Sequence, residues 1–184
     1  MNEKNTLYIV VPCYKEQEVL PETSKRLREK ILALRAEGKI SDKSRVMFVN
    51  DGSSDNTWPI IAQLHEQDPE MFSGVNLSRN RGHQNALLAG LMTAVNYADM
   101  IISMDADLQD DINAVDGMVD AYHEGFEVVY VGVDSDGFPL MDEVSDAIGS
   151  GAILASFMYV KSANILLHPG TLFPPIGNLI YYTI

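Results

Sequence analysis

Two aspartates close together in the chain, Asp105 and Asp107, have the type and spacing needed to bind a metal ion. They follow the apolar segment 99–104, so both carboxylates are expected at the end of a buried strand. Carboxylate oxygens are hard ligands that suit Mg²⁺ or Mn²⁺. A cation held there would neutralise a diphosphate and stabilise it as a leaving group. The alternative is a solvated acidic turn that caps the next helix.

Residues suited to a nucleotide follow two other apolar segments. Asp51 comes after 45–50, where its carboxylate could accept hydrogen bonds from a base or a ribose. Tyr14 and Glu16 come after 6–11, and they offer a ring that can stack on a base and a hydrogen-bond acceptor. Taken one at a time, each of these residues is better explained as part of an ordinary turn or helix start.

Arg79 and Arg81 follow a fourth segment, 72–77, and could contact phosphate because a guanidinium pairs with phosphate oxygens. A solvated loop explains them equally well. His83, in the same loop, receives no role. Cys13 is interpreted as a small buried residue rather than a reactive thiol.

These residues lie at strand ends in a regular alternation of strands and helices. The expected strands cover 6–11, 45–50, 72–77, 99–104 and 126–131, and the expected helices cover 16–37, 56–67, 84–96 and 115–124. This order predicts an α/β fold, a three-layer α/β/α sandwich with a mostly parallel sheet. Ligands of such sheets bind beyond the carboxyl ends of the strands, so the polar residues should converge on one edge.

Composition limits the class of protein. The 184 residues are 46% hydrophobic and 21% charged, which suits one globular domain. The formal net charge is −13, and twelve of the thirteen basic residues precede residue 82, so a nucleic-acid partner is not expected. One cysteine, no apolar stretch of about 18 residues and no signal-peptide pattern favour a cytoplasmic protein without a membrane span.

Four segments together are far more specific than any one of them. In chain order they are VPCYKEQE, VNDGSSDNT, LSRNRGHQNALLAG and MDADLQD. They resemble the family 2 glycosyltransferases of the GT-A fold, and most of all the polyprenyl-phosphate hexosyltransferases, such as bactoprenol glucosyltransferases and dolichol-phosphate mannose synthases. The resemblance covers residues 5–131, about two thirds of the chain.

The resemblance implies three groups of site residues, which bind the nucleotide, adjoin the ribose and diphosphate, and hold Mn or Mg. In that order they are Pro12, Tyr14, Glu16 and Asp51; Asp105 and Ala106; and Asp107 and Gln109. Asp105 and Asp107 are also expected to be the catalytic residues, and Arg79 and Arg81 to bind substrate.

The reaction that the resemblance implies is inverting transfer of a hexose from a nucleotide-diphosphate sugar, of the UDP-glucose or GDP-mannose type, to a polyprenyl phosphate. Such a lipid phosphate is already ionised near neutral pH, so a strong general base is less needed. Positioning and the charge of the metal would supply most of the catalysis. A lipid acceptor also implies work at the cytoplasmic face of a membrane.

Several positions depart from the family pattern. Lys15 stands where the family usually has asparagine, and Asp111 where proline is common. Family members continue after the fifth strand with an arginine-bearing segment, whereas 132–136 contains no arginine. We therefore expect a nucleotide-sugar-binding domain over 1–131 and an atypical tail over 132–184, with a helix at 141–160.

Other functions stay open. The missing arginines favour a truncated or divergent nucleotide-sugar-binding domain without transfer activity. A nucleotidyltransferase shares the need for nucleotide and metal, but it would usually show a glycine-rich basic loop after the first strand. A receiver-like Mg-binding signalling domain would need acidic residues at the end of the first strand, where this chain has Pro12, Cys13 and Tyr14.

Overall fold

The computed structural model describes residues 4–107 and 111–125 fully, and the backbone of 128–133, 139–143, 156–160 and 181–183. Within these ranges strands and helices alternate from the first strand to the fifth. The strands are β1 (Leu7–Cys13), β2 (Arg45–Asn50), β3 (Phe72–Leu77), β4 (Met100–Ser103), β5 (Val128–Val133), β6 (Pro139–Glu143), β7 (Ser156–Val160) and β8 (Tyr181–Thr183). The helices are α1 (Leu20–Ala36), α2 (Thr57–Gln67), α3 (His83–Ala94) and α4 (Ala114–Glu124).

The described strands form one sheet in the order β6-β5-β7-β4-β1-β2-β3-β8. Its centre, β4-β1-β2-β3, is parallel throughout. Antiparallel strands extend it on both sides, with β7 pairing to β4 and β8 pairing to β3. The parallel core was expected from the sequence, whereas the antiparallel additions were not.

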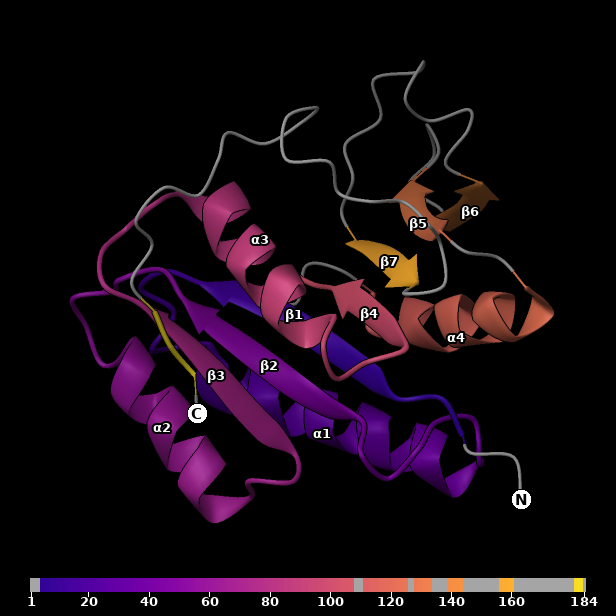
Figure 1. The fold of residues 1–184 in the computed structure, drawn as a ribbon, viewed down its shortest axis with the longest axis horizontal. Coiled ribbons are helices and arrows are strands. Elements are labelled where there is room, and N and C mark those ends of the chain that lie inside the picture. Colours follow the sequence, from indigo (N-terminus) through magenta and orange to yellow (C-terminus); the bar gives the residue numbers. More distant parts are fainter. Residues whose placement is uncertain are drawn as a thin grey trace.

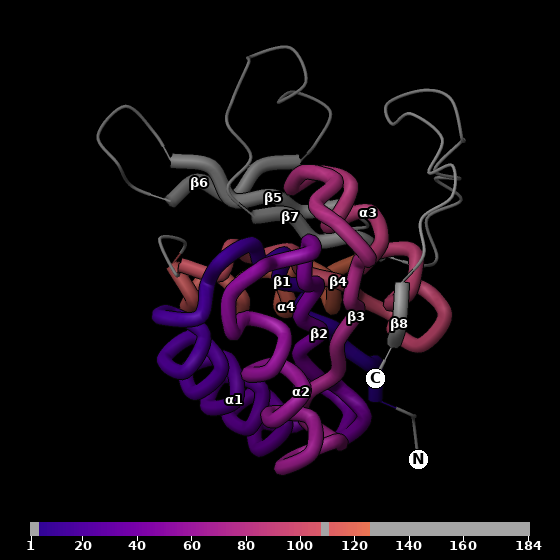
Figure 2. The backbone as a smooth tube through the Cα atoms, turned by 90° about the vertical axis from the view of Figure 1, so that its left-hand side faces the viewer, coloured from indigo at the N-terminus to yellow at the C-terminus, as the bar shows by residue number. Residues whose placement is uncertain are grey.

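Helices cover both faces of the parallel core (Figures 1 and 2). Alternate residues of β1 enter two separate apolar clusters, because successive side chains of a strand point to opposite faces. Leu7, Ile9 and Val11 pack with residues of α1, α2 and α4, and Tyr8 and Val10 pack with α3. The predicted α/β/α sandwich is therefore confirmed.

Most predicted elements are present, with small shifts at their ends. The first helix was expected from residue 16 but begins at Leu20, because Glu16–Val19 form a turn in which the Glu16 carbonyl accepts the N–H of Leu20 at 3.0 Å. Gly125 ends α4 in a left-handed conformation, as a glycine C-cap does.

The predicted helix over 141–160 is wrong at both ends. Residues 141–143 belong to β6 and 156–160 form β7, while 144–155 lie outside the described residues. The sequence of β7, SFMYV, is rich in residues that favour strands. Its pairing with β4 and β5 is a long-range interaction that helical spacing does not reveal. Among the helices that the structure describes, none combines the length and apolar character needed to cross a membrane.

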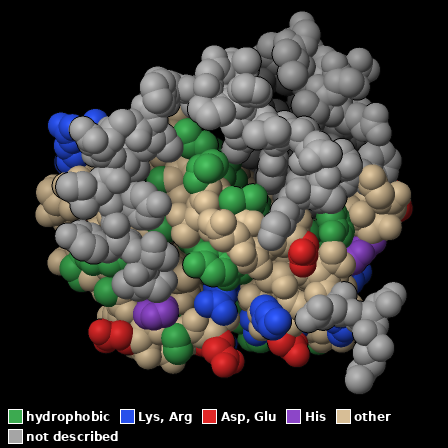
Figure 3. All heavy atoms as spheres, viewed as in Figure 1, with side chains coloured by type: hydrophobic (Ala, Val, Ile, Leu, Met, Phe, Trp, Pro, Cys, Tyr) green, Lys and Arg blue, Asp and Glu red, His purple; other side chains and the backbone are tan. Residues whose placement is uncertain are grey.

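Gly90 allows α3 to approach the sheet closely. A Cβ atom at this position would lie 2.5 Å from Val10 Cγ1 and 2.7 Å from Val49 Cγ2, on two neighbouring strands. Only hydrogen fits such a gap without displacing the helix or the valines. Hydrophobic side chains gather over α3 in Figure 3. Met92 of α3 is half-exposed, so another side of the same helix faces outward.

We expect Gly90→Ala to lower the free energy of unfolding by about 1–3 kcal/mol, because overpacking against two strands outweighs the better helix propensity of alanine. Urea denaturation would measure the change. Met92→Ala, on the exposed side of α3, is the matched control and should shift stability by less than about 1 kcal/mol. A Gly90→Ala variant as stable as the unmodified protein would contradict the close approach.

Candidate functional site

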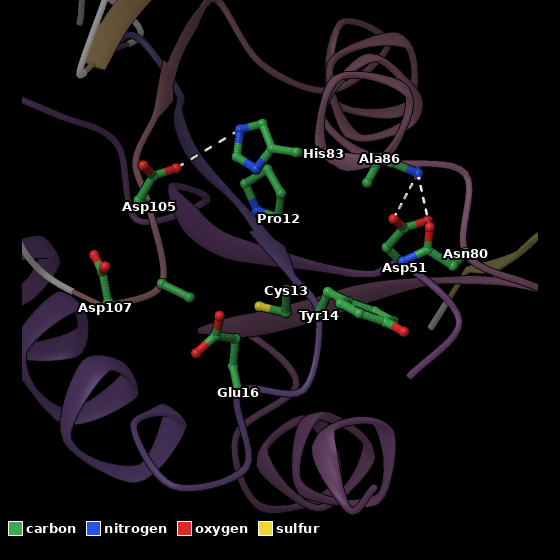
Figure 4. Close-up of a pocket in the computed structure, with 12 residues that line it drawn as sticks. Pro12, Cys13, Tyr14, Glu16, Asp51, Asn80, His83, Ala86, Asp105 and Asp107 are labelled. Atoms are coloured by element: carbon green, nitrogen blue, oxygen red, sulfur yellow. Dashed lines mark hydrogen bonds and ion pairs between the residues drawn. The ribbon is translucent and has the colours of Figure 1, made fainter. Parts of the chain in front are cut away.

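A cavity of about 270 Å³ lies at the carboxyl edge of the parallel core (Figure 4). Four connecting segments form its walls, those that follow β1, β2, β3 and β4. The lining residues are Pro12, Cys13, Tyr14, Glu16, Asp51, Asn80, Gly82, His83, Ala86, Asp105, Ala106 and Asp107. The cavity thus brings together seven of the residues selected from the sequence, namely Pro12, Tyr14, Glu16, Asp51, Asp105, Ala106 and Asp107.

The turn after β1 is held in place by the loop after β2. The backbone N–H of Lys15 donates to Ser53 Oγ at 3.0 Å, and that of Glu16 donates to Thr57 Oγ1 at 2.9 Å. Lys15 has a φ of 60°, in the left-handed region that asparagine and glycine tolerate better than lysine. Tyr14 lines the cavity and is 44% exposed, and Lys15 Nζ lies over its ring at 5.4 Å from the centroid.

Asp51 lies beneath the cavity and is only 2% exposed. Its Oδ1 accepts the backbone N–H of Arg81 at 2.7 Å, and its Oδ2 accepts that of Gly82 at 2.8 Å. Its own N–H donates to the Cys13 carbonyl at 2.9 Å. Asp51 therefore links the end of β1, through its backbone, and the loop after β3, through its carboxylate.

Hydrogen bonds to β1 and α1 hold the segment that carries Asp105 and Asp107. The Met104 N–H donates to the Val10 carbonyl at 3.1 Å, which extends the parallel pairing beyond the end of β4. The buried Thr23 hydroxyl of α1 donates to the Ala106 carbonyl at 2.6 Å. With Ala106 buried between them, Asp105 and Asp107 both remain exposed at the cavity.

His83 lies across the cavity from the first aspartate, with its Nε2 atom 3.7 Å from Asp105 Oδ1 (Figure 4). It begins α3 and was given no role from the sequence. It is also the only basic group among the described residues that line the cavity, where four carboxylates are present.

Glu16 lies close to other acidic groups, and its carboxylate points toward the Asp105–Asp107 segment in Figure 4. Burial raises the pKa of the Glu16 carboxyl, and the charges of Asp107, Asp55 and Asp105 raise it further. Burial also raises the pKa of the Cys13 thiol, with a contribution from Glu16. Cys13 is therefore a protonated, buried wall residue, in agreement with its interpretation from the sequence.

Two Asp side chains at the cavity fit a divalent cation that is shared with a substrate. The described residues contain no group of three or more His, Cys, Asp or Glu side chains placed to hold a metal alone. Mg²⁺ is usually bound by one or two carboxylates together with substrate phosphates and water, so Asp105 and Asp107 match that mode of binding. Gln109, the other expected metal ligand, lies outside the described residues.

The two arginines differ from the other expected substrate-binding residues, because neither is among the residues that line the cavity. Arg79 is exposed and Arg81 is half-buried. The Arg81 backbone is fixed, since its N–H binds Asp51 and its carbonyl accepts Asn85 Nδ2 at 2.8 Å. Contact of their guanidinium groups with phosphate stays a prediction.

Sequence reasoning gave no role to five lining residues, namely Cys13, Asn80, Gly82, His83 and Ala86. Four of them belong to the segment LSRNRGHQNALLAG, whose specificity was recognised as a whole. Within that segment the arginines were predicted to bind phosphate, because a charged side chain is the easiest phosphate-binding feature to recognise in a sequence. The structure instead directs Asn80, Gly82 and His83 toward the cavity.

A parallel core between helix layers, with an acidic cavity at its carboxyl edge, defines an α/β domain of the GT-A glycosyltransferase type. Residues 8–143 match the Glycosyl transferase family 2, which covers more than half of the chain. The chain therefore belongs to this family of glycosyltransferase enzymes.

Relatives and a solved structure agree with this assignment. The chain is 48% identical over 124 residues to the uncharacterized glycosyltransferase YkoT of Bacillus subtilis (strain 168), covering 67% of this chain and 36% of the relative. It is 38% identical over 122 residues to YkcC of the same organism, another uncharacterized glycosyltransferase, covering 66% and 35%. This chain thus spans about a third of the length of these relatives.

The solved structure is the mannosyltransferase PcManGT from Pyrobaculum calidifontis in complex with GDP-Man and Mn²⁺. It shares the fold at a TM-score of 0.51 and 21% identity, over 72% of this chain and 36% of that one.

The raised pKa of Glu16 makes a prediction about pH and stability. The folded state binds the Glu16 proton more readily than the unfolded state, so ionisation near neutral pH destabilises the fold. Glu16→Gln should therefore be more stable than the unmodified protein at neutral pH, and the gain should shrink as pH falls through the raised pKa. Urea denaturation at several pH values measures this, with the exposed Glu18→Gln as control. A gain that grows toward acidic pH would contradict it.

Proposed function

We propose that this chain binds a nucleotide-diphosphate sugar in the cavity and, with Mn²⁺ or Mg²⁺, transfers the hexose with inversion to a polyprenyl phosphate. The observation that carries the proposal is the convergence of Tyr14, Glu16, Asp51, Asp105 and Asp107 on one cavity at the carboxyl edge of a parallel sheet. Membership in Glycosyl transferase family 2 supports the reaction class.

The nucleotide occupies the side of the cavity formed by the turns after β1 and β2. Tyr14 is 44% exposed at the cavity and its ring suits stacking on a base, and Pro12 and Glu16 also line the cavity. The GDP-Man bound by the Pyrobaculum mannosyltransferase supports a donor of the GDP-mannose type, and a UDP-glucose type donor has the same diphosphate.

The diphosphate lies beside Asp105, Ala106 and Asp107. Asp107 and Gln109 hold the cation, which when bound neutralises charge on the leaving diphosphate. His83 Nε2 lies 3.7 Å from Asp105 Oδ1, so the two side chains together border this side of the cavity. An acceptor phosphate is a nucleophile that is already ionised, so the described residues need only orient it.

The charge of the cavity favours one alternative, a nucleotide-sugar-binding domain without transfer activity. No lysine or arginine is among the described residues that line the cavity. Donor diphosphate and acceptor phosphate are both anionic, and repulsion between them in a partly dry cleft costs roughly several kcal/mol. Arg79 and Arg81, at the edge of the same loop, are the described arginines nearest in sequence to the lining residues and would contact the acceptor.

Nucleotide binding should depend on the metal and on Asp107. Calorimetric titration with a panel of nucleotide sugars should show tighter binding with Mn²⁺ than without it. Asp107→Asn should weaken the metal-dependent binding by more than about tenfold, because it removes a charged ligand. Asp42→Asn removes the same charge from an exposed loop that precedes β2, and it should bind as the unmodified protein does. Equal affinity in Asp107→Asn would exclude the metal role.

Transfer is tested on the same protein with radiolabelled donor and detergent-solubilised polyprenyl phosphate. The proposal expects metal-dependent formation of a labelled lipid. Because one divalent cation cannot neutralise both substrates, Arg79→Ala and Arg81→Ala should slow turnover more than they weaken donor binding. Donor binding without any labelled product would establish the alternative, a binding domain without transfer activity.

A further inference from the structure

A buried hydroxyl of α1 contacts the segment that carries two aspartates of the cavity. Thr23 is only 1% exposed, and its Oγ1 atom donates to the Ala106 carbonyl oxygen at 2.6 Å. Ala106 stands between Asp105 and Asp107 in the chain and is itself buried. One side chain of α1 therefore holds the backbone midway between the two carboxylates that fit a divalent cation.

The hydroxyl of Thr23 has a second acceptor within its own helix. The carbonyl oxygen of Val19, one turn earlier, lies 3.0 Å from Oγ1. A hydroxyl carries one proton, so the shorter contact, with Ala106, is the main hydrogen bond. A bond to the preceding turn is open to any helical threonine. The bond to Ala106 instead joins two elements that are 83 residues apart in the chain.

Thr23 also occupies a position of α1 where an apolar residue would be expected. Leu20, Leu27 and Ile31 are fully buried and recur at helical spacing on the same face of the helix. Burial of a hydroxyl costs free energy unless the group is hydrogen-bonded, and valine has nearly the same shape without that cost. Packing alone therefore does not account for a threonine here, whereas the bond to Ala106 does.

The segment after β4 needs such a bond because it carries charges that repel its neighbours. Besides burial, the charges of Asp107, Asp55 and Asp105 raise the pKa of the Glu16 carboxyl. Carboxylates of the turn after β1 and of the segment after β4 thus act on one another, and their repulsion favours a wider separation. The bond from Thr23 opposes this separation without adding a charge to the cavity.

A second hydrogen bond holds the other end of the same segment. The Met104 N–H donates to the Val10 carbonyl of β1 at 3.1 Å. Asp105 therefore lies between two backbone anchors, one on β1 and one on α1. Because the pairing of β4 with β1 fixes the first anchor, the second is the one that a single side chain controls.

We propose that Thr23 is a positioning residue for the cation site, whose hydroxyl sets, through the Ala106 carbonyl, the backbone from which Asp105 and Asp107 reach a divalent cation. Thr23 is not among the described residues that line the cavity, so it acts through the backbone and not by contact with a ligand. The inference rests on the proposed function, because it requires that this segment binds a cation together with a diphosphate.

Two substitutions at this position separate the hydroxyl from the shape of the side chain. Thr23→Val removes the hydroxyl, and Thr23→Ser keeps it. Calorimetric titration with GDP and with UDP, in the presence and absence of Mn²⁺, compares them. Thr23→Val should weaken Mn²⁺-dependent binding by about tenfold or more, because groups that orient metal ligands typically have effects of this size. Binding without Mn²⁺ should not change, and Thr23→Ser should bind nearly as the unmodified protein does.

Thr93→Val is the matched control. Thr93 of α3 donates its hydroxyl to the Ala89 carbonyl at 2.8 Å, one turn earlier, as Thr23 does to Val19. The same substitution there removes an intrahelical bond but no bond to the segment after β4. Mn²⁺-dependent binding should therefore be unchanged in Thr93→Val, and urea denaturation of all variants separates a loss of binding from a loss of stability.

A measurement on the ligand-free protein reports the hydrogen bond itself. The NMR resonance of the Ala106 carbonyl carbon should move upfield in Thr23→Val, as expected when a carbonyl loses a hydrogen bond. It should stay in place in Thr23→Ser and in Thr93→Val. A resonance that is the same in Thr23→Val and in the unmodified protein would overturn the inference whether or not a nucleotide binds.

The binding outcomes are also distinct. Mn²⁺-dependent binding that is equally tight in Thr23→Val and in the unmodified protein overturns the inference and leaves the proposed function intact. Equal weakening in Thr23→Val and Thr93→Val overturns it as well. An unmodified protein that binds neither nucleotide with Mn²⁺ overturns the proposed function, and the positioning role with it. If Thr23→Val does not fold, Thr23→Ala carries the test, with circular dichroism confirming its fold.

Discussion

Parallel pairing of β1 with a strand on each side decides which residues reach the cavity. Cys13 pairs with Asn50, so β1 and β2 end at the same level, whereas β4 ends at Ser103 opposite Val10, three residues earlier along β1. Helices bury both faces of β1, and a slip of one residue would move each apolar set to the wrong face. The register is therefore fixed, and the polar residues that follow the strands meet at one edge.

The elements of the parallel core were predictable because their signals are local. Runs such as 6–11 are apolar and rich in β-branched residues, and the Asp105–Asp107 pair can be recognised from two positions in the chain. The partners of Asp51 could not be predicted, because they are backbone groups 30 and 31 residues away whose direction depends on a left-handed glycine. For the same reason β7 was missed, since its position depends on pairing with β4 and β5.

Acidic groups dominate the described lining of the cavity, where Asp51 is buried and Asp105 and Asp107 are exposed. Burial raises the pKa of the Glu16 carboxyl, and the charges of Asp107, Asp55 and Asp105 raise it further. Such a cavity is unfavourable for an anionic ligand until a cation enters it. Under the proposed function, a diphosphate would therefore enter this cavity together with a divalent cation.

The left-handed backbone of Lys15 has a consequence for the order in which the site assembles. A lysine held at a φ of 60° is disfavoured by about 1 kcal/mol, so the local sequence does not by itself form this turn. The hydrogen bonds that offset this cost come from Ser53 and Thr57, 38 and 41 residues later in the chain. A growing polypeptide cannot complete the turn that carries Tyr14 and Glu16 until β2 and its loop have been synthesised, so this wall of the cavity forms after the strands that support it.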